Sequence, residues 1–152
     1  MTKMNTSIQS AMKSLDFLIG RWNTEGEILA NEGNTAIHFK GTDRYEWILD
    51  GHYIRHEVNV IMDQEKVEAI EIIGEFNPET KRYKMRSFDN KGTFTEMDGY
   101  FDEKGTFHSL GSKMRSELSI TDNHTLAASW ENTKDNQNWR PWMELTLSKF
   151  YL

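Results

Sequence analysis

The chain has 152 residues, a length that suits one folded domain able to bury about two-thirds of its unfolded surface. It contains no cysteine, which excludes disulfides, thiolate metal sites and thiol nucleophiles, and favours a reducing compartment. Its 24 acidic and 18 basic residues give a net charge of -6 and are interleaved along the chain. We therefore expect neither nucleic acid nor membrane as a partner, because both require clustered Lys and Arg.

The first ten residues lack the apolar core of a signal peptide. No later apolar run approaches the ~20 residues that a membrane-spanning helix needs. The sequence therefore predicts a soluble, cytoplasmic protein in which residues 1–152 form a single domain.

Residues 7–19 precede the first strand-like segment and contain one short helix. Ile8, Met12 and Leu15 have helical spacing, and residues 16–19 form a lead-in to the first strand. We expect the apolar face of this helix to lie over one mouth of a barrel or along its wall. The predicted boundary places the helix and lead-in at 1–19 and the barrel at 20–152.

After Trp22 the pattern changes to the two-residue period of strands. Turn signals such as Asp50-Gly51 and Asn77-Pro78 separate the strand-like runs. The links are too short for the crossovers that parallel strands need, so we expect an antiparallel up-and-down meander that closes into a barrel. A β-sandwich is the main structural alternative. The predicted strands, about 8–10 in the barrel, are 21–30, 35–49, 52–62, 66–76, 81–88, 93–101, 105–110, 113–121, 124–131 and 141–151.

Alternation along each strand predicts which side chains point inward. The proposed inner face is mostly apolar and aromatic, with a few polar groups: Thr24, His56, Ser87, and Glu96 or Asp98. In the fourth strand, Ile70, Ile72 and Phe76 are expected inward and Glu71 and Glu75 outward. An apolar pocket with a few converging polar groups is typical of small-molecule sites.

Three segments carry a resemblance to a known family: Phe17 to Glu27 with Gly20-Arg21-Trp22, Tyr45 to Tyr53, and Gly74 to Tyr83. The chain resembles bacterial calycin-like barrels of a family of unknown function, which are related in fold to lipocalins and fatty-acid-binding proteins. The resemblance implies a binding barrel and no reaction. It also implies that Gly20 and Trp22 form the barrel floor, where a basic residue of the last strand covers the indole. Lys149 is the first candidate for that residue and Arg140 the second.

Histidines raise two alternatives, a metal site and a haem site. His52 and His56 would lie about 13 Å apart on one strand, too far to ligate one zinc ion, so we expect no metal. Some calycin-like barrels bind haem through one histidine, and His56 faces the predicted lumen. His38, His108 and His124 could do so only if the alternation is misread or a loop folds inward. We expect no cofactor, with haem kept as an alternative.

Two further classes remain open. An acid–base enzyme would use a lumen His or carboxylate, from His56, Glu96 and Asp98, with Tyr45 or Tyr83 as donor. An assembly protein, such as a homodimer, would bury an outer apolar patch for which the candidates are Trp139, Trp142, Phe150 and Tyr151.

The favoured function is binding of a small, largely apolar molecule inside the barrel. His56 would be its polar anchor. The other predicted ligand-binding residues supply contact area: Tyr45, Trp47, Tyr83, Met85, Met114 and Trp130.

Overall fold

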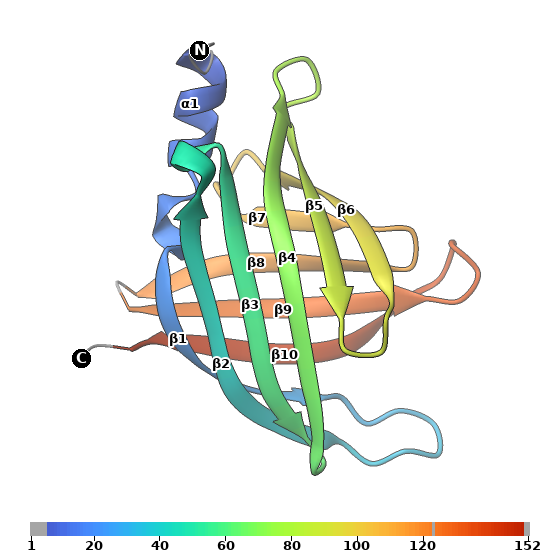
Figure 1. Ribbon diagram of the computed structural model, residues 1–152. Helices are drawn as coiled ribbons and strands as arrows, with labels where there is room; N and C mark the ends of the chain where they lie inside the picture. The colour runs from blue at the N-terminus through green and yellow to red at the C-terminus, as the bar shows by residue number, and fades with distance from the viewer. Residues whose placement is uncertain (1–5, 123, 151–152) are drawn as a thin grey trace.

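The computed structural model describes residues 6–122 and 124–150 (Figure 1). The helix α1 spans Thr6–Lys13, and a 3-10 turn spans Asp16–Leu18. The described residues then form ten strands: β1 Gly20–Ile28, β2 Ile37–Ile48, β3 Tyr53–Met62, β4 Glu65–Asn77, β5 Arg82–Asp89, β6 Phe94–Phe101, β7 Phe107–Leu110, β8 Met114–Asp122, β9 Thr125–Thr133 and β10 Trp139–Lys149. A second 3-10 turn, Leu49–Gly51, joins β2 to β3.

The ten strands close into one barrel in which each strand pairs antiparallel with its neighbours in the sequence. The barrel closes where β1 pairs with β10, at Trp22 opposite Lys149. The predicted up-and-down barrel with a short N-terminal helix is therefore confirmed. The last predicted strand extended to Tyr151, which lies outside the described residues.

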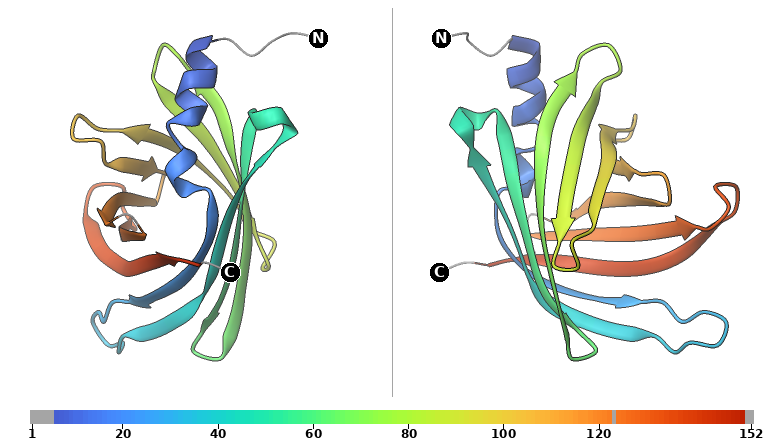
Figure 2. Two further views of the ribbon diagram at one scale, coloured as in Figure 1. Left: turned by 90° about the vertical axis from the view of Figure 1, so that its left-hand side faces the viewer. Right: turned by 45° about the vertical axis from the view of Figure 1, so that its right-hand side comes forward.

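Strands β2 to β5 run roughly across strands β7 to β10, so that the inward faces of the two groups meet (Figures 1 and 2). This crossing places the core between the two groups of strands. Among the described residues, no helix is long and apolar enough to cross a membrane.

Helix α1 and the 3-10 turn after it fill one end of the barrel. Met12, Leu15 and Leu18 are almost fully buried there. The Tyr83 hydroxyl donates to the backbone carbonyl of Ala11 at 2.6 Å, tying the helix to β5. The apolar face of the helix thus stabilises the barrel by closing it at this end.

The Gly-x-Trp segment lies at the start of β1. Trp22 is 2% exposed, and its indole N–H donates to the Leu18 carbonyl at 2.8 Å. Lys149 Nζ lies 5.2 Å from the indole ring centroid and donates to the Ile19 carbonyl at 2.8 Å. Gly20 has a φ of 137°, and a Cβ there would lie 2.8 Å from Lys149 Cε. Arg140, exposed and paired with Asn132, lies elsewhere on β10.

The inward face of β4 differs from the prediction. Glu71 and Ile73 are buried, whereas Ile70 is 43% exposed. Isoleucines occupy both faces of this strand, so apolar content could not distinguish them, and the choice of face was wrong for Ile70, Ile72 and Glu71. A bulge between Gly74 and Asn77 then shifts the alternation, and Phe76 packs inward against Tyr83 as expected.

Candidate functional site

A row of inward-facing side chains crosses strands β2 to β6 at one level. Register makes successive members direct cross-strand partners: Tyr45 faces His56, His56 faces Glu71, Glu71 faces Ser87, and Ser87 faces Thr95. We call Tyr45, His56, Glu71, Ser87 and Thr95 the polar row. The next row toward the helix is apolar and contains Trp47, Ile54, Ile73, Met85 and Met97.

His56 lies between two carboxylates. Its Nε2 is 2.6 Å from Asp43 Oδ2, and its Nδ1 is 3.0 Å from Glu71 Oε1. The side chains of His56, Asp43 and Glu71 are 11%, 8% and 10% exposed, respectively. With both ring nitrogens donating to carboxylates, the imidazole is held in its doubly protonated form.

Electrostatics agree with this protonation state. Burial by itself lowers the pKa of His56, but the hydrogen bonds to Asp43 and Glu71 and the charges of the two carboxylates raise it to about 9. Burial also raises the pKa of Tyr45, and the negative charges of Asp43 and Glu71 raise it further. The tyrosine is therefore neutral, and the cluster carries two negative charges and one positive charge.

Two further contacts fix the cluster. The Tyr45 ring stacks on the His56 imidazole, with centroids 3.9 Å apart and planes 11° apart. The Thr24 hydroxyl on β1 donates to Asp43 Oδ1, which leaves Asp43 held between two strands. These contacts orient both Asp43 and the imidazole through side chains of neighbouring strands.

The lumen differs on the two sides of the polar row. Toward the helix, inward-facing residues such as Ile54, Ile73 and Leu126 are at most 2% exposed. On the other side most inward-facing residues are only half-buried: Val58, Ala69, Leu118, Ala128, Trp130, Met143 and Leu145. Phe39 and Val60 are buried exceptions. The cluster thus borders the part of the lumen whose lining side chains are less fully buried.

The seven predicted ligand-binding residues fall into three places. Tyr45 and His56 touch each other in the polar row. Trp47, Tyr83 and Met85 lie toward the helix, where Trp47 Nε1 donates to Asp16 Oδ1 at 3.2 Å and burial raises the pKa of Tyr83 to about 12. Met114 and Trp130 belong to β8 and β9, on the crossing strands.

Sequence reasoning missed Asp43 and Glu71. Asp43 lies two residues before Tyr45 and four before Trp47 on the same strand. The alternation of side chains alone could therefore have placed it inward. Glu71 could be found only through register, because it faces His56 directly across β3 and β4.

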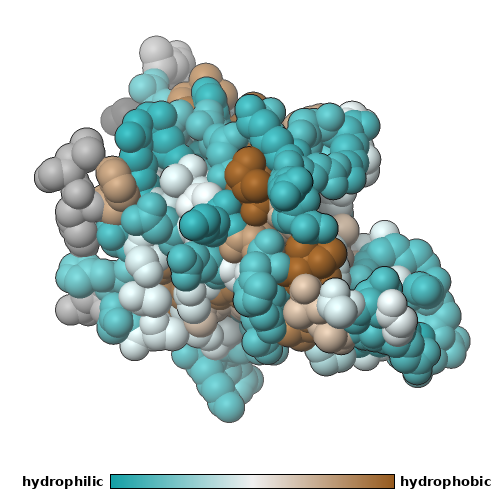
Figure 3. Space-filling model, turned by 90° about the horizontal axis from the view of Figure 1, so that it is seen from below, coloured by the Kyte–Doolittle hydropathy of each residue, from teal (hydrophilic) through white to brown (hydrophobic). Residues whose placement is uncertain are grey.

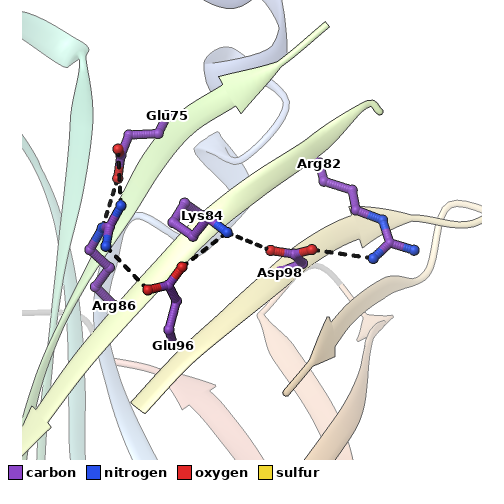
Figure 4. Close-up of polar contacts among 6 residues, drawn as sticks. All are labelled: Glu75, Arg82, Lys84, Arg86, Glu96 and Asp98. Carbon is purple, nitrogen blue, oxygen red and sulfur yellow. Dashed lines mark hydrogen bonds and ion pairs between the residues drawn. The ribbon is translucent and has the colours of Figure 1, made fainter. Parts of the chain in front are cut away.

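Glu96 and Asp98, expected inward as acid–base candidates, lie on the outer face instead. They alternate with basic residues in a chain of ion pairs over β4, β5 and β6 (Figure 4). Lys84 Nζ lies 3.0 Å from a carboxylate oxygen of each. Neither carboxylate faces the lumen, because the inward positions of β6 belong to Thr95, Met97 and Gly99.

Two concave regions occur on the barrel wall, one over β1 to β3 and β8 to β10, the other over β6 to β10. A groove of about 1020 Å³ borders outward-facing residues such as Glu25, Lys40 and Thr146. A second, of about 670 Å³, includes Trp130 and Glu131. The face seen from below is mostly hydrophilic, with small separate hydrophobic patches (Figure 3).

Two of the aromatic residues considered for self-association, Trp139 and Trp142, have partners within the chain. Trp142 packs edge-on against Trp130 at 6.2 Å, and the Arg115 guanidinium lies 4.2 Å from the Trp139 ring centroid. Phe150 is 41% exposed, and Tyr151 lies outside the described residues.

Metal ligation does not fit this arrangement. The two carboxylates approach His56 from its two opposite nitrogens, so the three groups do not converge on one point. Among residues 6–122 and 124–150, no group of three His, Asp or Glu side chains is placed to hold a metal ion.

The chain matches one known protein family over almost its whole length. The family described as protein of unknown function, DUF1579, matches residues 7–149. The chain belongs to this family. That finding confirms the expected membership in a barrel family of unknown function. No curated protein matches the sequence significantly.

Solved structures share the fold at low identity. Rv2717c from M. tuberculosis superposes with a TM-score of 0.72 and 10% identity, over 93% of this chain and 98% of its own. The S-type phycobiliprotein lyase CPES from Guillardia theta gives 0.65 and 9%, over 99% of both chains. The barrel EF1p2_mFAP2b bound to DFHBI gives 0.52 and 6%, over 92% and 99%. At these identities the likeness concerns the fold.

Proposed function

We propose that the barrel reversibly binds a small, largely apolar molecule in its lumen, anchored by the cluster of Asp43, His56 and Glu71. The observation that carries this proposal is the position of the cluster. A buried charged group is costly, and this one borders half-buried small side chains such as Val58 and Ala69. A molecule placed there would contact apolar surface and a polar anchor together.

The wall around this space would supply the contact area. Tyr45 presents its ring beside His56, and Trp130 and Met114 lie on the crossing strands. Trp47, Tyr83 and Met85 would act from beneath, by holding the helix-side floor on which the ligand rests. A barrel of this fold can hold a small molecule, as the neighbour bound to DFHBI illustrates.

The geometry favours binding over acid–base catalysis. A general base needs a free lone pair and a pKa near the operating pH. Both ring nitrogens of His56 are occupied by carboxylates, and its pKa of about 9 keeps it protonated at neutral pH. The imidazolium therefore serves as a fixed charge that orients Asp43 and Glu71.

Native mass spectrometry of freshly purified protein, followed by titration with the neutral probe N-phenyl-1-naphthylamine, tests the proposal. We expect saturable one-to-one binding that quenches tryptophan emission. Val58→Trp fills the lumen beside the cluster and should abolish binding, whereas the matched control Asn59→Trp points outward and should not.

Circular dichroism and thermal unfolding establish that each variant is folded. If Val58→Trp does not fold, Ala69→Leu offers a smaller obstruction on the facing strand and should weaken binding. Equal probe binding by the wild type and both lumen variants would rule the lumen out as the site.

A further inference from the structure

The charged cluster in the lumen wall is unbalanced. Asp43 and Glu71 each contribute one negative charge, and the single imidazolium of His56 lies between them. The neighbouring members of the polar row, Tyr45 and Ser87, are neutral. This part of the lumen therefore carries a net negative charge close to one unit.

One carboxylate oxygen of the cluster remains without a protein donor. Asp43 is held through both oxygens, by Thr24 and by His56. Glu71 accepts from His56 through Oε1, and no donor among the described residues reaches its Oε2. The Glu71 side chain is only 10% exposed, and its strand position directs it into the lumen. This oxygen is not among the fully buried atoms without a partner, so it keeps accessible surface from which it can accept a hydrogen bond from a donor in the lumen.

No basic side chain of the wall supplies that donor. On the strands that carry the polar row, the described Lys and Arg residues point outward, and most of them pair with outer carboxylates, as Arg55 does with Glu57 and Lys84 with Glu96. Lys149 faces inward at the helix end, where it covers Trp22 and donates to the Ile19 carbonyl.

We propose that the ligand, bound in the lumen as proposed above, has an apolar body and a protonated amine as its polar end, which donates to Glu71. An ammonium group satisfies the free carboxylate oxygen and neutralises the excess charge of the cluster. The apolar body then lies against Val58, Ala69 and the crossing strands.

The same arrangement disfavours ligands that carry a carboxylate. A fatty acid would place a third negative charge beside Asp43 and Glu71, where the His56 imidazolium is already paired with both carboxylates. A neutral alcohol of equal chain length can donate one hydrogen bond and should bind with intermediate affinity. The expected order of affinity is therefore amine, alcohol, carboxylate.

Competition against bound N-phenyl-1-naphthylamine at pH 7.5 measures this order with decylamine, decanol and decanoate, each below its micelle concentration. We expect decylamine to displace the probe at a concentration about tenfold or more below that of decanoate. Glu71→Gln should remove most of the advantage of decylamine over decanoate, and it should change the affinity for decanol much less. Glu68→Gln removes the same charge from the outer face of β4 and should change nothing.

The outcomes separate this inference from the proposed function. Failure of the probe and of all three competitors to bind would refute the proposed function, binding in the lumen. Binding of the probe and decanol without an amine advantage, or with decanoate strongest, would overturn the inference alone. An amine advantage that survives Glu71→Gln would also overturn it, because the amine would then bind elsewhere.

A second variant covers the case in which Glu71→Gln does not fold. Ser87→Lys places a cation directly across from Glu71 on β5. It should abolish the preference for decylamine over decanoate while probe binding persists. Retention of that preference would contradict the assignment.

Discussion

Glu71 is the direct cross-strand partner of His56, and the two inward-facing side chains meet with 3.0 Å between Oε1 and Nδ1. On the other side of the ring, Asp43 Oδ2 lies 2.6 Å from Nε2. Three residues from three consecutive strands thus form one charged unit inside a barrel whose other inward positions are mostly apolar. Several measurable consequences depend on this unit.

The first concerns the pH dependence of stability. The pKa of His56 rises from 6.5 to about 9 on folding, so the protonated ring stabilises the folded state. That contribution is complete below pH 6.5 and is lost as pH rises through about 9. We expect the free energy of unfolding to fall across this window by an amount of the order of 3 kcal/mol. Urea unfolding at half-unit steps from pH 6 to 10 measures it.

A variant without the charged unit provides the control. The combined change Asp43→Asn, His56→Gln, Glu71→Gln removes all three titrating groups and should flatten this part of the profile. His52→Gln removes an exposed imidazole and should leave the slope intact. Parallel profiles for the wild type and the triple variant would refute a raised His56 pKa.

The second prediction concerns the Thr24 hydroxyl. It donates to the carboxylate of Asp43 in a buried position, and Thr24 is 2% exposed. Thr24→Val keeps the shape but removes the donor, and should lower the free energy of unfolding by about 1–3 kcal/mol. Thr42→Val makes the same change on the exposed face of β2 and should cost much less. Equal losses for the two variants in urea unfolding would argue against the buried hydrogen bond.

The third prediction concerns Gly20. Alanine there would adopt a φ of 137° and bring its Cβ to 2.8 Å from Lys149 Cε, displacing the lysine from Trp22. We expect Gly20→Ala to cost about 1–3 kcal/mol and to change the emission of Trp22. Gly33 also has a positive φ, of 83°, but open space around it, so Gly33→Ala should cost only about 1 kcal/mol. Thermal unfolding of both variants compares the strain with and without the clash.

The fourth prediction concerns haem. Iron ligation needs a free imidazole lone pair, and both nitrogens of His56 donate to carboxylates. Added haem should therefore give the same Soret spectrum with the wild type and with His56→Ala. A histidine-ligated spectrum that disappears in His56→Ala would show that the cluster opens to accept iron.

Particular residues show how far the sequence could lead. Alternation along β2 and β3 placed Tyr45, Trp47, Ile54 and His56 correctly inward, because only one face of each strand was apolar. The rule failed for β4, where isoleucines occupy both faces and Glu71 takes the inward one. It also failed for Glu96 and Asp98, which satisfy outer cations instead.

Local chemistry along the chain was enough to predict the strands, the turns, the short N-terminal helix and the antiparallel pairing of successive strands. Those features depend on neighbours close in sequence and on the two-residue period of strands. Only the tertiary structure decided which polar groups meet inside. Contact between Thr24, Asp43, His56 and Glu71 requires the register of four strands, and burial of two carboxylates is tolerable only because an imidazolium lies between them.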